Sequence, residues 1–282
     1  MVPVAPFVDL TALWIQVTGT WCNLQCRHCL NASGPRDPWL APLAMDTVRA
    51  AIADAERLGV KEIYFTGGEP FLHRQILEML ELSLAVAPTT VLTNGTLVTE
   101  ALADALAALA RAAAYSLEIR VSVDHVDPER NDRVRGRGAW ARALRAVRLL
   151  DARGLVPIVA ATELSGAESG ADLYQAFRDL LLAHGVQKPR VKMLPLFAAG
   201  RLARADAERL TEEALEGFDR GQLQCAETRV VAADGVYACP ILAGLPGARL
   251  SDGGLEASFR SAPLYHPACV TCHRTGMTCR NA

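Results

Sequence analysis

Eight cysteines are the residues of this 282-residue chain best suited to chemistry, and they fall into two groups. The first group lies in the segment CNLQCRHC, directly after an apolar run typical of a strand, and consists of Cys22, Cys26 and Cys29. The second group lies in roughly the last fifth of the chain and consists of Cys225, Cys239, Cys269, Cys272 and Cys279. Because a long stretch without cysteine separates the two groups, we expect two sites rather than one.

The first group places three thiols so close together that they suit one compact metal centre. A zinc site would need a fourth ligand, which His28 cannot easily supply because it is adjacent to Cys29. A [4Fe–4S] cube normally takes four thiolates, so three would leave one iron without a protein ligand. An open metal position suits a site that must bind a substrate or cofactor. Buried core cysteines and an incomplete zinc site are the alternatives.

The CX3CX2C spacing of this segment resembles the signature of the radical S-adenosylmethionine (radical SAM) superfamily. Three further segments resemble the strand ends of that family: IYFTGGEP at 63–70, VLTNG at 91–95 and VSVDHVDPERNDRVRG at 121–136. In the last of these, His125 replaces the usual glycine. The resemblance implies a [4Fe–4S] cluster on the three cysteines, with the methionine part of S-adenosylmethionine (SAM) chelating the fourth iron.

The glycine-rich segment is expected to bind the ammonium group of SAM. Gly67 and Gly68 have no Cβ, so a ligand can approach the backbone closely, and Glu69 adds a carboxylate. An ordinary tight turn between strand and helix is the alternative. By the same resemblance, Ser122 contacts the methionine carboxylate and Asp124 lies near the ribose; these two could instead simply end a strand.

Two more residues are candidates for the cofactor site. His28 precedes the third cysteine, where the family places an aromatic residue against the adenine; an exposed loop histidine is the alternative. Asn94 follows the third strand of the pattern and is assigned to SAM binding, with a plain turn as the alternative.

Strand-like and amphipathic helical runs alternate along most of the chain. Strands are predicted at 13–17, 62–66, 90–93, 118–123, 156–161 and 190–194, and helices near 46–58, 71–86, 100–113, 139–153, 172–184 and 206–218. This alternation predicts an α/β fold of parallel strands with right-handed crossovers, which places ligands at the carboxyl ends of the strands. The resemblance implies a partial (β/α)6 barrel. We therefore expect a barrel domain at 1–217 and a small cysteine-rich module at 218–282.

The second group of cysteines lies in a segment rich in glycine and proline, with a hairpin predicted around Asp234 and Gly235. So little apolar sequence folds poorly alone, and a bound metal would add stability. The segment resembles the auxiliary-cluster module of the SPASM and Twitch subfamilies, the shorter Twitch-like form fitting better. The resemblance implies a second [4Fe–4S] cluster, with four preferred ligands: Cys225, Cys239, Cys269 and Cys272. A structural zinc site would satisfy the same spacing.

The fifth cysteine of this group, Cys279, has three interpretations. It is a possible alternative cluster ligand, a free thiol that donates a hydrogen atom to a substrate radical, or an inert tail thiol. The nearby His266 and His273 are expected to support the site or face solvent.

Charge and composition limit the classes of function. The formal net charge of −2 argues against a nucleic-acid-binding protein, whose footprint would be strongly basic. The N-terminus lacks a signal-peptide pattern, and the longest uncharged stretch, 82–99, contains turn residues that argue against a membrane span. We therefore expect a cytoplasmic protein whose cysteines bind metal rather than form disulfides. The arginine-rich stretch 130–153 is interpreted as a solvated helix face, with an anionic-substrate or partner patch as the alternative.

The resemblance implies a radical enzyme. A reduced cluster passes one electron to SAM, which yields methionine and a 5′-deoxyadenosyl radical, and this radical abstracts hydrogen from a substrate C–H bond. An auxiliary cluster would then accept an electron from the substrate radical, and a flavodoxin or ferredoxin would act as reductant. A non-enzymatic iron–sulfur electron carrier or sensor is a distant alternative.

Two kinds of substrate fit this chemistry. Oxidation or epimerisation of a small metabolite is preferred, because few residues precede the first predicted strand and a leader-binding domain would not fit there. The alternative is a maturase that crosslinks or epimerises a ribosomally made peptide.

Overall fold

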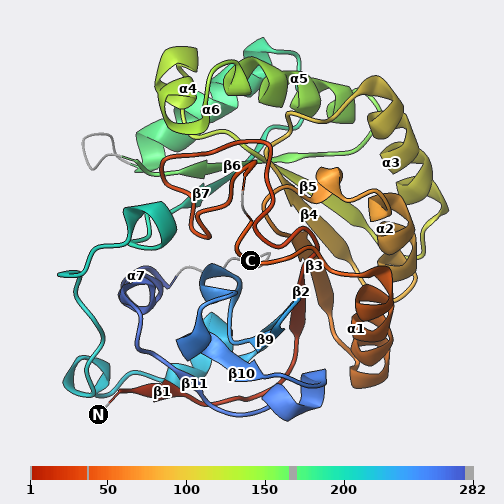
Figure 1. Ribbon diagram of the computed structural model, residues 1–282. Coiled ribbons are helices and arrows are strands. Elements are labelled where there is room, and N and C mark those ends of the chain that lie inside the picture. The colour runs from red at the N-terminus through yellow and green to blue at the C-terminus, as the bar shows by residue number, and fades with distance from the viewer. Residues whose placement is uncertain (1, 37, 165–169, 277–282) are drawn as a thin grey trace.

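A sheet of nine strands forms the centre of the computed structural model, which describes residues 2–36, 38–164 and 170–276 (Figure 1). The strand order is β10-β9-β8-β2-β3-β4-β5-β6-β7. Six neighbouring parallel strands are β2 (Ala12–Gln16), β3 (Glu62–Thr66), β4 (Thr89–Thr93), β5 (Leu117–Ser122), β6 (Ile158–Thr162) and β7 (Arg190–Leu194). All six predicted strands are therefore confirmed, with their ends shifted by at most two residues.

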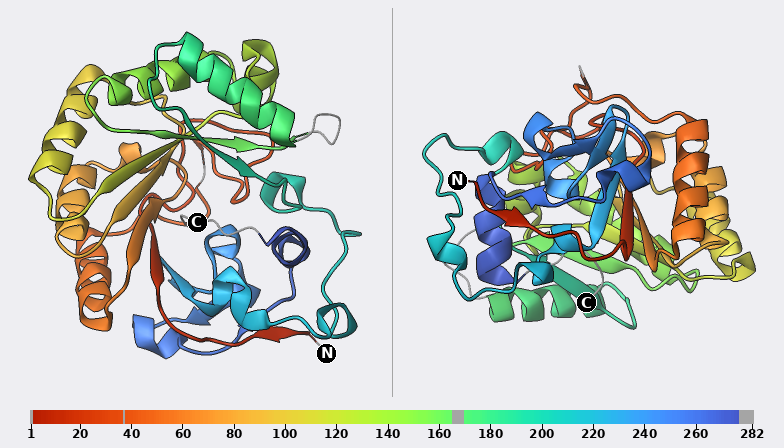
Figure 2. Two further views of the ribbon diagram at one scale, coloured as in Figure 1. Left: turned by 180° about the vertical axis from the view of Figure 1, so that it is seen from behind. Right: turned by 90° about the horizontal axis from the view of Figure 1, so that it is seen from below.

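Helices cover the convex outer face of these parallel strands (Figure 2). They are α1 (Met45–Leu58), α2 (Ile76–Leu84), α3 (Glu100–Ala112), α5 (Ala139–Asp151) and α6 (Gly170–Ala183), while α4 (Pro128–Arg135) lies beside α5. Helix α4 was not predicted, although Asp127 caps it by accepting a hydrogen bond from Arg130 N at 2.8 Å and Pro128 occupies its first turn.

Local sequence explains where the outer helices form and end. In α1 the buried residues Val48, Ala51, Ile52 and Ala55 recur every three or four positions, so they share one face of the helix. Gly59 ends α1 at a φ of +69°, a left-handed conformation that glycine adopts without strain.

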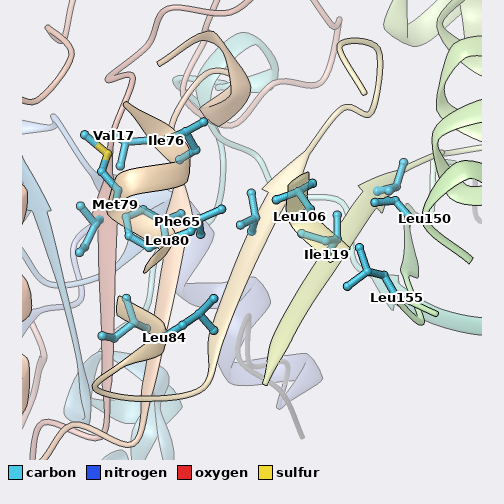
Figure 3. Packing of buried hydrophobic residues seen from close by; sticks show 14 of the residues in the cluster. Val17, Phe65, Ile76, Met79, Leu80, Leu84, Leu106, Ile119, Leu150 and Leu155 are labelled. Carbon is cyan, nitrogen blue, oxygen red and sulfur yellow. The ribbon is translucent and has the colours of Figure 1, made fainter. Parts of the chain in front are cut away.

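The main hydrophobic core lies between the sheet and these helices (Figure 3). Side chains alternate across each strand, so Ile63 and Phe65 of β3 join this core while Tyr64 faces the inside of the barrel. In β2, Trp14 likewise faces inward and stacks on Tyr64 with ring centroids 4.2 Å apart. The inner face therefore carries large aromatic side chains, which join Val230, Ile241 and Leu242 of the C-terminal segment in a second, smaller hydrophobic cluster.

The barrel is open in the part of the chain that the structure describes, because β7 and β10 are both edge strands. This confirms the partial α/β barrel expected from the sequence. The helix expected near 206–218 is wrong: those residues form irregular structure with only a short turn at Glu213–Leu215. Leu210 and Leu215 are buried there but stand five residues apart, which places them on different sides of a helix.

The C-terminal segment adds to the same sheet. Strand β8 (Thr228–Ala232) pairs in parallel with β2, and β9 (Gly235–Tyr237) and β10 (Arg249–Ser251) continue antiparallel from it. The expected hairpin is thus present between β8 and β9. At the N-terminus, β1 (Val4–Ala5) pairs with β11 (Ala262–Pro263), and α7 (Pro267–Thr275) follows. The division at 217 remains a prediction, since strand pairing crosses it.

Among the described residues, no helix is both long enough and apolar enough to span a bilayer.

Candidate active site

The three cysteines of the first group lie on one loop after β2 and line one cavity of about 230 Å³. Leu24 N donates to Cys22 Sγ at 3.4 Å, and Ser33 N donates to Cys29 Sγ at 3.3 Å. Burial raises the pKa of Cys22 to about 12 and also raises that of Cys26. Such buried thiols ionise readily only when positive charge is brought to them, which an iron–sulfur cluster would do.

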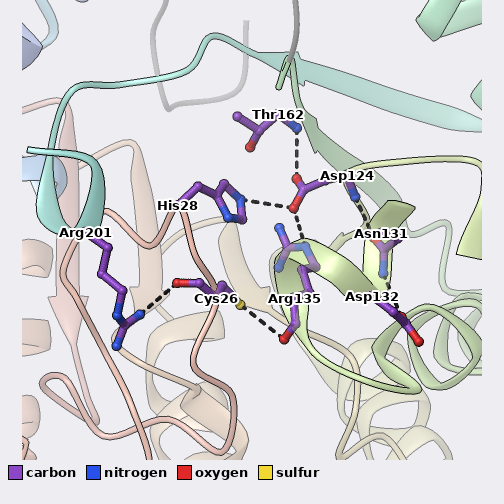
Figure 4. A network of polar contacts seen from close by, with 8 residues as sticks. All are labelled: Cys26, His28, Asp124, Asn131, Asp132, Arg135, Thr162 and Arg201. Atoms are coloured by element: carbon purple, nitrogen blue, oxygen red, sulfur yellow. Dashed lines mark hydrogen bonds and ion pairs between the residues drawn. The ribbon is translucent and has the colours of Figure 1, made fainter. Parts of the chain in front are cut away.

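Arg201, which follows the last parallel strand β7, holds this loop through hydrogen bonds. Its guanidinium donates to Cys26 O at 2.8 Å (Figure 4). It also donates to Ala32 O at 2.9 Å and to Ser33 O at 2.6 Å. A Cβ on the preceding Gly200 would stand 2.1 Å from Cys29 O, so only glycine allows the segment to approach this closely. The loop geometry thus depends on a segment 175 residues further along the chain.

A charged network fixes the histidine of the loop (Figure 4). Asp124, at the carboxyl end of β5, lies 3.0 Å from His28 Nε2 and 2.5 Å from Arg135 Nε. Thr162 N donates to its other oxygen at 3.0 Å. Burial alone would raise the pKa of Asp124, but Arg135 and His28 hold it well below its usual range. The carboxylate is therefore charged and orients both partners.

The glycine pair at the end of β3 packs against the cysteine loop. A Cβ on Gly67 would stand 2.3 Å from Thr18 Oγ1, and one on Gly68 would stand 2.1 Å from Trp21 O. Both glycines also line the cavity. The absence of a side chain at these two positions therefore lets the two loops pack closely. It also leaves room for a ligand to approach the backbone.

Glu69 is fully buried and its contacts are internal. It accepts hydrogen bonds from Thr93 Oγ1 and Asn94 N, both at 2.7 Å, and from Phe71 N at 3.2 Å. Burial raises its pKa to about 7, although these three donors act in the opposite direction. Glu69 therefore joins the end of β3 to the end of β4.

Asn94 connects the cysteine loop to β4. Its side-chain amide donates to Asn23 Oδ1 at 2.9 Å and lies 3.7 Å from Cys22 Sγ. Eight of the residues proposed from the sequence line the cavity: Cys22, Cys26, His28, Cys29, Gly67, Gly68, Asn94 and Ser122. Glu69 and Asp124 stand behind this lining, and each contacts a residue that belongs to it.

The cavity offers polar groups to a ligand such as SAM. Within the described residues, His28 Nδ1 and Ser33 Oγ are buried without a hydrogen-bond partner, and both residues line the cavity. Buried polar atoms of this kind are costly unless something satisfies them. The donor set, three thiols beside unsatisfied polar atoms, thus fits an iron–sulfur cluster with a polar cofactor.

The second cysteine group surrounds a small cavity of about 30 Å³. Apolar side chains line it together with four thiols, those of Cys225, Cys239, Cys269 and Cys272. Burial raises the pKa of Cys225 to about 12 and that of Cys239 well above its usual range, and neighbouring thiols raise both further. No three His, Cys, Asp or Glu side chains in the described ranges are placed to hold a single metal ion. An iron–sulfur cube binds its thiolates through four different irons, so it fits wider spacing than zinc.

The structure describes two of the three remaining candidate residues near this second group, namely His266 and His273. His266 caps α7, its Nδ1 accepting from Ala268 N at 3.1 Å. His273 makes an edge contact with Phe218, the ring centroids being 4.7 Å apart. Cys279 lies outside the described residues, so its interpretations stay predictions.

Two arginines of the site were not identified from the sequence. The stretch 130–153 was interpreted as a solvated face, but Arg135 is largely buried beside Asp124. Its position after the Asp-Pro helix cap was the available signal. Nothing in the sequence around Arg201 indicates contact with the cysteine loop, because that contact arises only from the curvature of the sheet.

Comparisons with known proteins agree with this geometry. A mycofactocin maturase (MftC) of Mycobacterium ulcerans strain Agy99 is 28% identical over 293 aligned positions, which cover 86% of this chain and 73% of the relative. A GTP 3′,8-cyclase of Mycolicibacterium smegmatis is 29% identical over 272 positions, covering 91% and 69% of the two chains. The structure of Streptococcus suis SuiB bound to S-adenosylmethionine has the same fold, with a TM-score of 0.64 at 16% identity over 91% of this chain and 67% of that one.

A family model supports the assignment directly. The model of the radical SAM superfamily matches residues 17–165, which span the cysteine loop, the glycine pair and the Asp124 network. This match covers more than half of the chain, and the protein therefore belongs to the radical SAM superfamily of enzymes.

Proposed function

We propose that this radical SAM enzyme is a maturase that modifies a peptide through abstraction of hydrogen from a C–H bond. The observation that carries the proposal is the convergence of three thiols, a glycine pair, Asn94 and Ser122 on one cavity at the carboxyl ends of the strands. Similarity to proteins named mycofactocin maturase favours a maturase over the small-metabolite enzyme preferred from the sequence.

Members of this superfamily use a [4Fe–4S] cluster and SAM. In this chain Cys22, Cys26 and Cys29 would hold the cluster, and Gly67, Gly68, Asn94 and Ser122 would contact SAM, with His28 against the adenine. Glu69 and Asp124 would act from behind this lining, through Asn94 and His28. When bound, the two cofactors supply a 5′-deoxyadenosyl radical that abstracts hydrogen from the substrate.

The chain itself contributes position and enclosure. Asp124 orients His28, Glu69 joins two strand ends below the cavity, and Arg201 holds the loop carbonyls. The inward-facing Trp14 and Tyr64 and the cavity-lining Phe197 are buried, so they shield the interior from water. Exclusion of water and alignment of the reacting C–H bond are what a protein adds to cofactor chemistry.

The C-terminal residues 218–282 are proposed as a SPASM/Twitch-like module with a second [4Fe–4S] cluster. Four thiols around one cavity support this: Cys225, Cys239, Cys269 and Cys272. The cluster would accept an electron from the substrate radical, and Cys279 stays a candidate ligand or hydrogen donor. A flavodoxin or ferredoxin is proposed as the reductant.

Similarity to GTP 3′,8-cyclases over 91% of this chain supports a second candidate, a small-molecule substrate. The two candidates differ in what accelerates SAM cleavage. A short peptide encoded beside this gene should increase the rate of 5′-deoxyadenosine formation if the enzyme is a maturase. GTP should do so, and the peptide should not, if the second candidate holds.

Metal content tests the proposed sites directly. Protein reconstituted without oxygen should hold about eight irons per chain, and about four after Cys22, Cys26 and Cys29 are all changed to alanine. The variant should also form no 5′-deoxyadenosine from SAM and dithionite. If the unmutated protein holds only about four irons and the variant holds none, the proposal of a second cluster fails. If the variant still forms 5′-deoxyadenosine, the assignment of the first cluster fails.

A further inference from the structure

A second cavity, of about 110 Å³, lies inside the barrel between the two cysteine groups. It shares five lining residues with the cavity of the cysteine loop: Leu30, Asn31, Thr66, Leu92 and Leu194. Its other end reaches Pro240 and Ile241, directly after Cys239, and Ile241 also lines the cavity of the second group. A group seated here would therefore lie between the two proposed clusters.

Two cationic side chains line this cavity, those of Arg120 and Lys192. Its described lining contains no carboxylate. Strand register brings them there, because Arg120 of β5 pairs with Leu92 of β4 and Lys192 of β7 pairs with Ala160 of β6. Arg120 is only 3% exposed and stands over the Tyr64 ring, 5.5 Å from its centroid. Both cations are thus built into the inner face of the sheet rather than placed on the surface.

The carboxylate that pairs with Arg120 Nε belongs to Glu118, which does not line the cavity. Glu118 accepts from Arg120 Nε at 3.0 Å and from Arg190 Nη2 at 2.8 Å, so it is shared between two arginines. A further donor lines the cavity, since Trp14 is 1% exposed and its indole N–H has no hydrogen-bond partner among the described residues. An acceptor bound in the cavity would satisfy this donor.

We propose that this cavity anchors an anionic group of the substrate, a carboxylate or a phosphate, through Arg120, Lys192 and the indole N–H of Trp14. The inference rests on the proposed function, because it needs a substrate inside the barrel. Charge-assisted hydrogen bonds in a buried site give both affinity and orientation. The cavity admits a small group but not a whole peptide, so the rest of the substrate extends toward the cysteine loop.

Three aromatic probes of similar size test the proposal on the reconstituted enzyme: benzoate, phenyl phosphate and the uncharged benzamide. Calorimetric titration should give a Kd for at least one anion that is about tenfold or more below that of benzamide. Preference for benzoate over phenyl phosphate indicates a carboxylate on the substrate, and the reverse indicates a phosphate. If the unmutated enzyme binds all three probes with equal affinity, the proposal is wrong.

Variants locate the binding. Arg120→Gln and Lys192→Gln should each remove most of the preference for the anion. Arg190→Gln is the matched control, because Arg190 also pairs with Glu118 but does not line the cavity, and it should keep the preference. An anion preference that survives both substitutions in the cavity would place the site elsewhere.

Formation of 5′-deoxyadenosine from SAM by the unmutated enzyme separates the two proposals. If it forms while anions and benzamide bind alike, the proposed function stands and the subsite fails. If none forms while the anion preference depends on Arg120 and Lys192, the subsite is real and the proposed function fails.

Discussion

At the scale of single residues, burial decides what each carboxylate of the molecule does. Asp124 and Asp104 both lie 2.5 Å from an arginine Nε, yet the side chain of Asp124 is fully buried and that of Asp104 is 66% exposed. Water screens an exposed pair, whereas a buried charge depends on its partner. Asp124 is therefore structural support for the site, and Asp104 is a surface group.

Replacing Asp124 with asparagine should destabilise the protein by about 3 kcal/mol, because Arg135 would keep a buried charge without its counter-charge. Asp104→Asn is the control, and its effect should be far smaller. Urea unfolding of both variants measures the difference. Equal effects of the two substitutions would contradict the role given to Asp124.

The buried carboxyl of Glu69 makes stability depend on pH. Its pKa is raised from 4.5 to about 7, so between these values the folded chain holds a proton that the unfolded chain has lost. The contribution of this group to stability is therefore complete below pH 4.5 and falls as pH rises to about 7. Relative to Glu69→Gln, the unmutated protein should lose about 2 kcal/mol of unfolding free energy between pH 5.5 and 7. Parallel stability curves for the two proteins would refute this.

At the scale of elements, the cysteine loop is held by neighbours that lie far away in the sequence. It receives hydrogen bonds from Arg201, close backbone contact from Gly200 and Gly68, and an amide contact from Asn94. Within the segment from Cys22 to Cys29, Cys29 N donates to Cys26 O at 3.3 Å, whereas Arg27 N donates at 2.9 Å to Val134 O of α4. The shape of the loop therefore depends on the elements that surround it.

Changing Arg201 to glutamine should loosen the loop, because three hydrogen bonds from a charged donor are lost. Iron bound by the first cysteine group should then pass to a chelator about tenfold faster than in the unmutated enzyme. Arg204→Gln is the matched control, since Arg204 is exposed and its guanidinium pairs with Asp206 two residues away. Unchanged iron loss in Arg201→Gln would show that the loop is rigid without this contact.

At the scale of the whole molecule, one sheet connects the barrel to the cysteine-rich C-terminal segment. Strand β8 hydrogen-bonds in parallel to β2, the strand that leads into the cysteine loop. Unfolding of the C-terminal segment would expose the edge of β2 and the inner aromatic cluster around Trp14. The two parts should therefore unfold together.

Removing two C-terminal thiols tests this coupling. Cys269→Ser combined with Cys272→Ser should lower Tm by at least about 5 °C while calorimetry still shows a single transition, because metal binding adds to the stability of the shared sheet. Thr271→Ser, on the same helix turn, should leave Tm nearly unchanged. Two separate transitions would show that the cysteine-rich segment unfolds independently.

Sequence alone was sufficient for the six parallel strands and for α1, α3, α5 and α6, because periodic burial is a local property. It missed α4, and α2 begins at Ile76 rather than near residue 71. It also singled out the three cysteines and the residues at the strand ends, since parallel strands bring their carboxyl ends to one edge. The sequence failed at 206–218, where charged residues that suit a helix surround two leucines whose partners lie in the C-terminal segment.

Only the tertiary structure decided which distant residues meet. The buried state of Arg135, the contacts of Arg201 and the pairing of β8 with β2 each join segments that are separated in the chain. Strand register likewise placed Arg120 and Lys192 together inside the barrel. A sequence pattern records the face and the end of an element, but the curvature of the sheet determines which faces and ends come into contact.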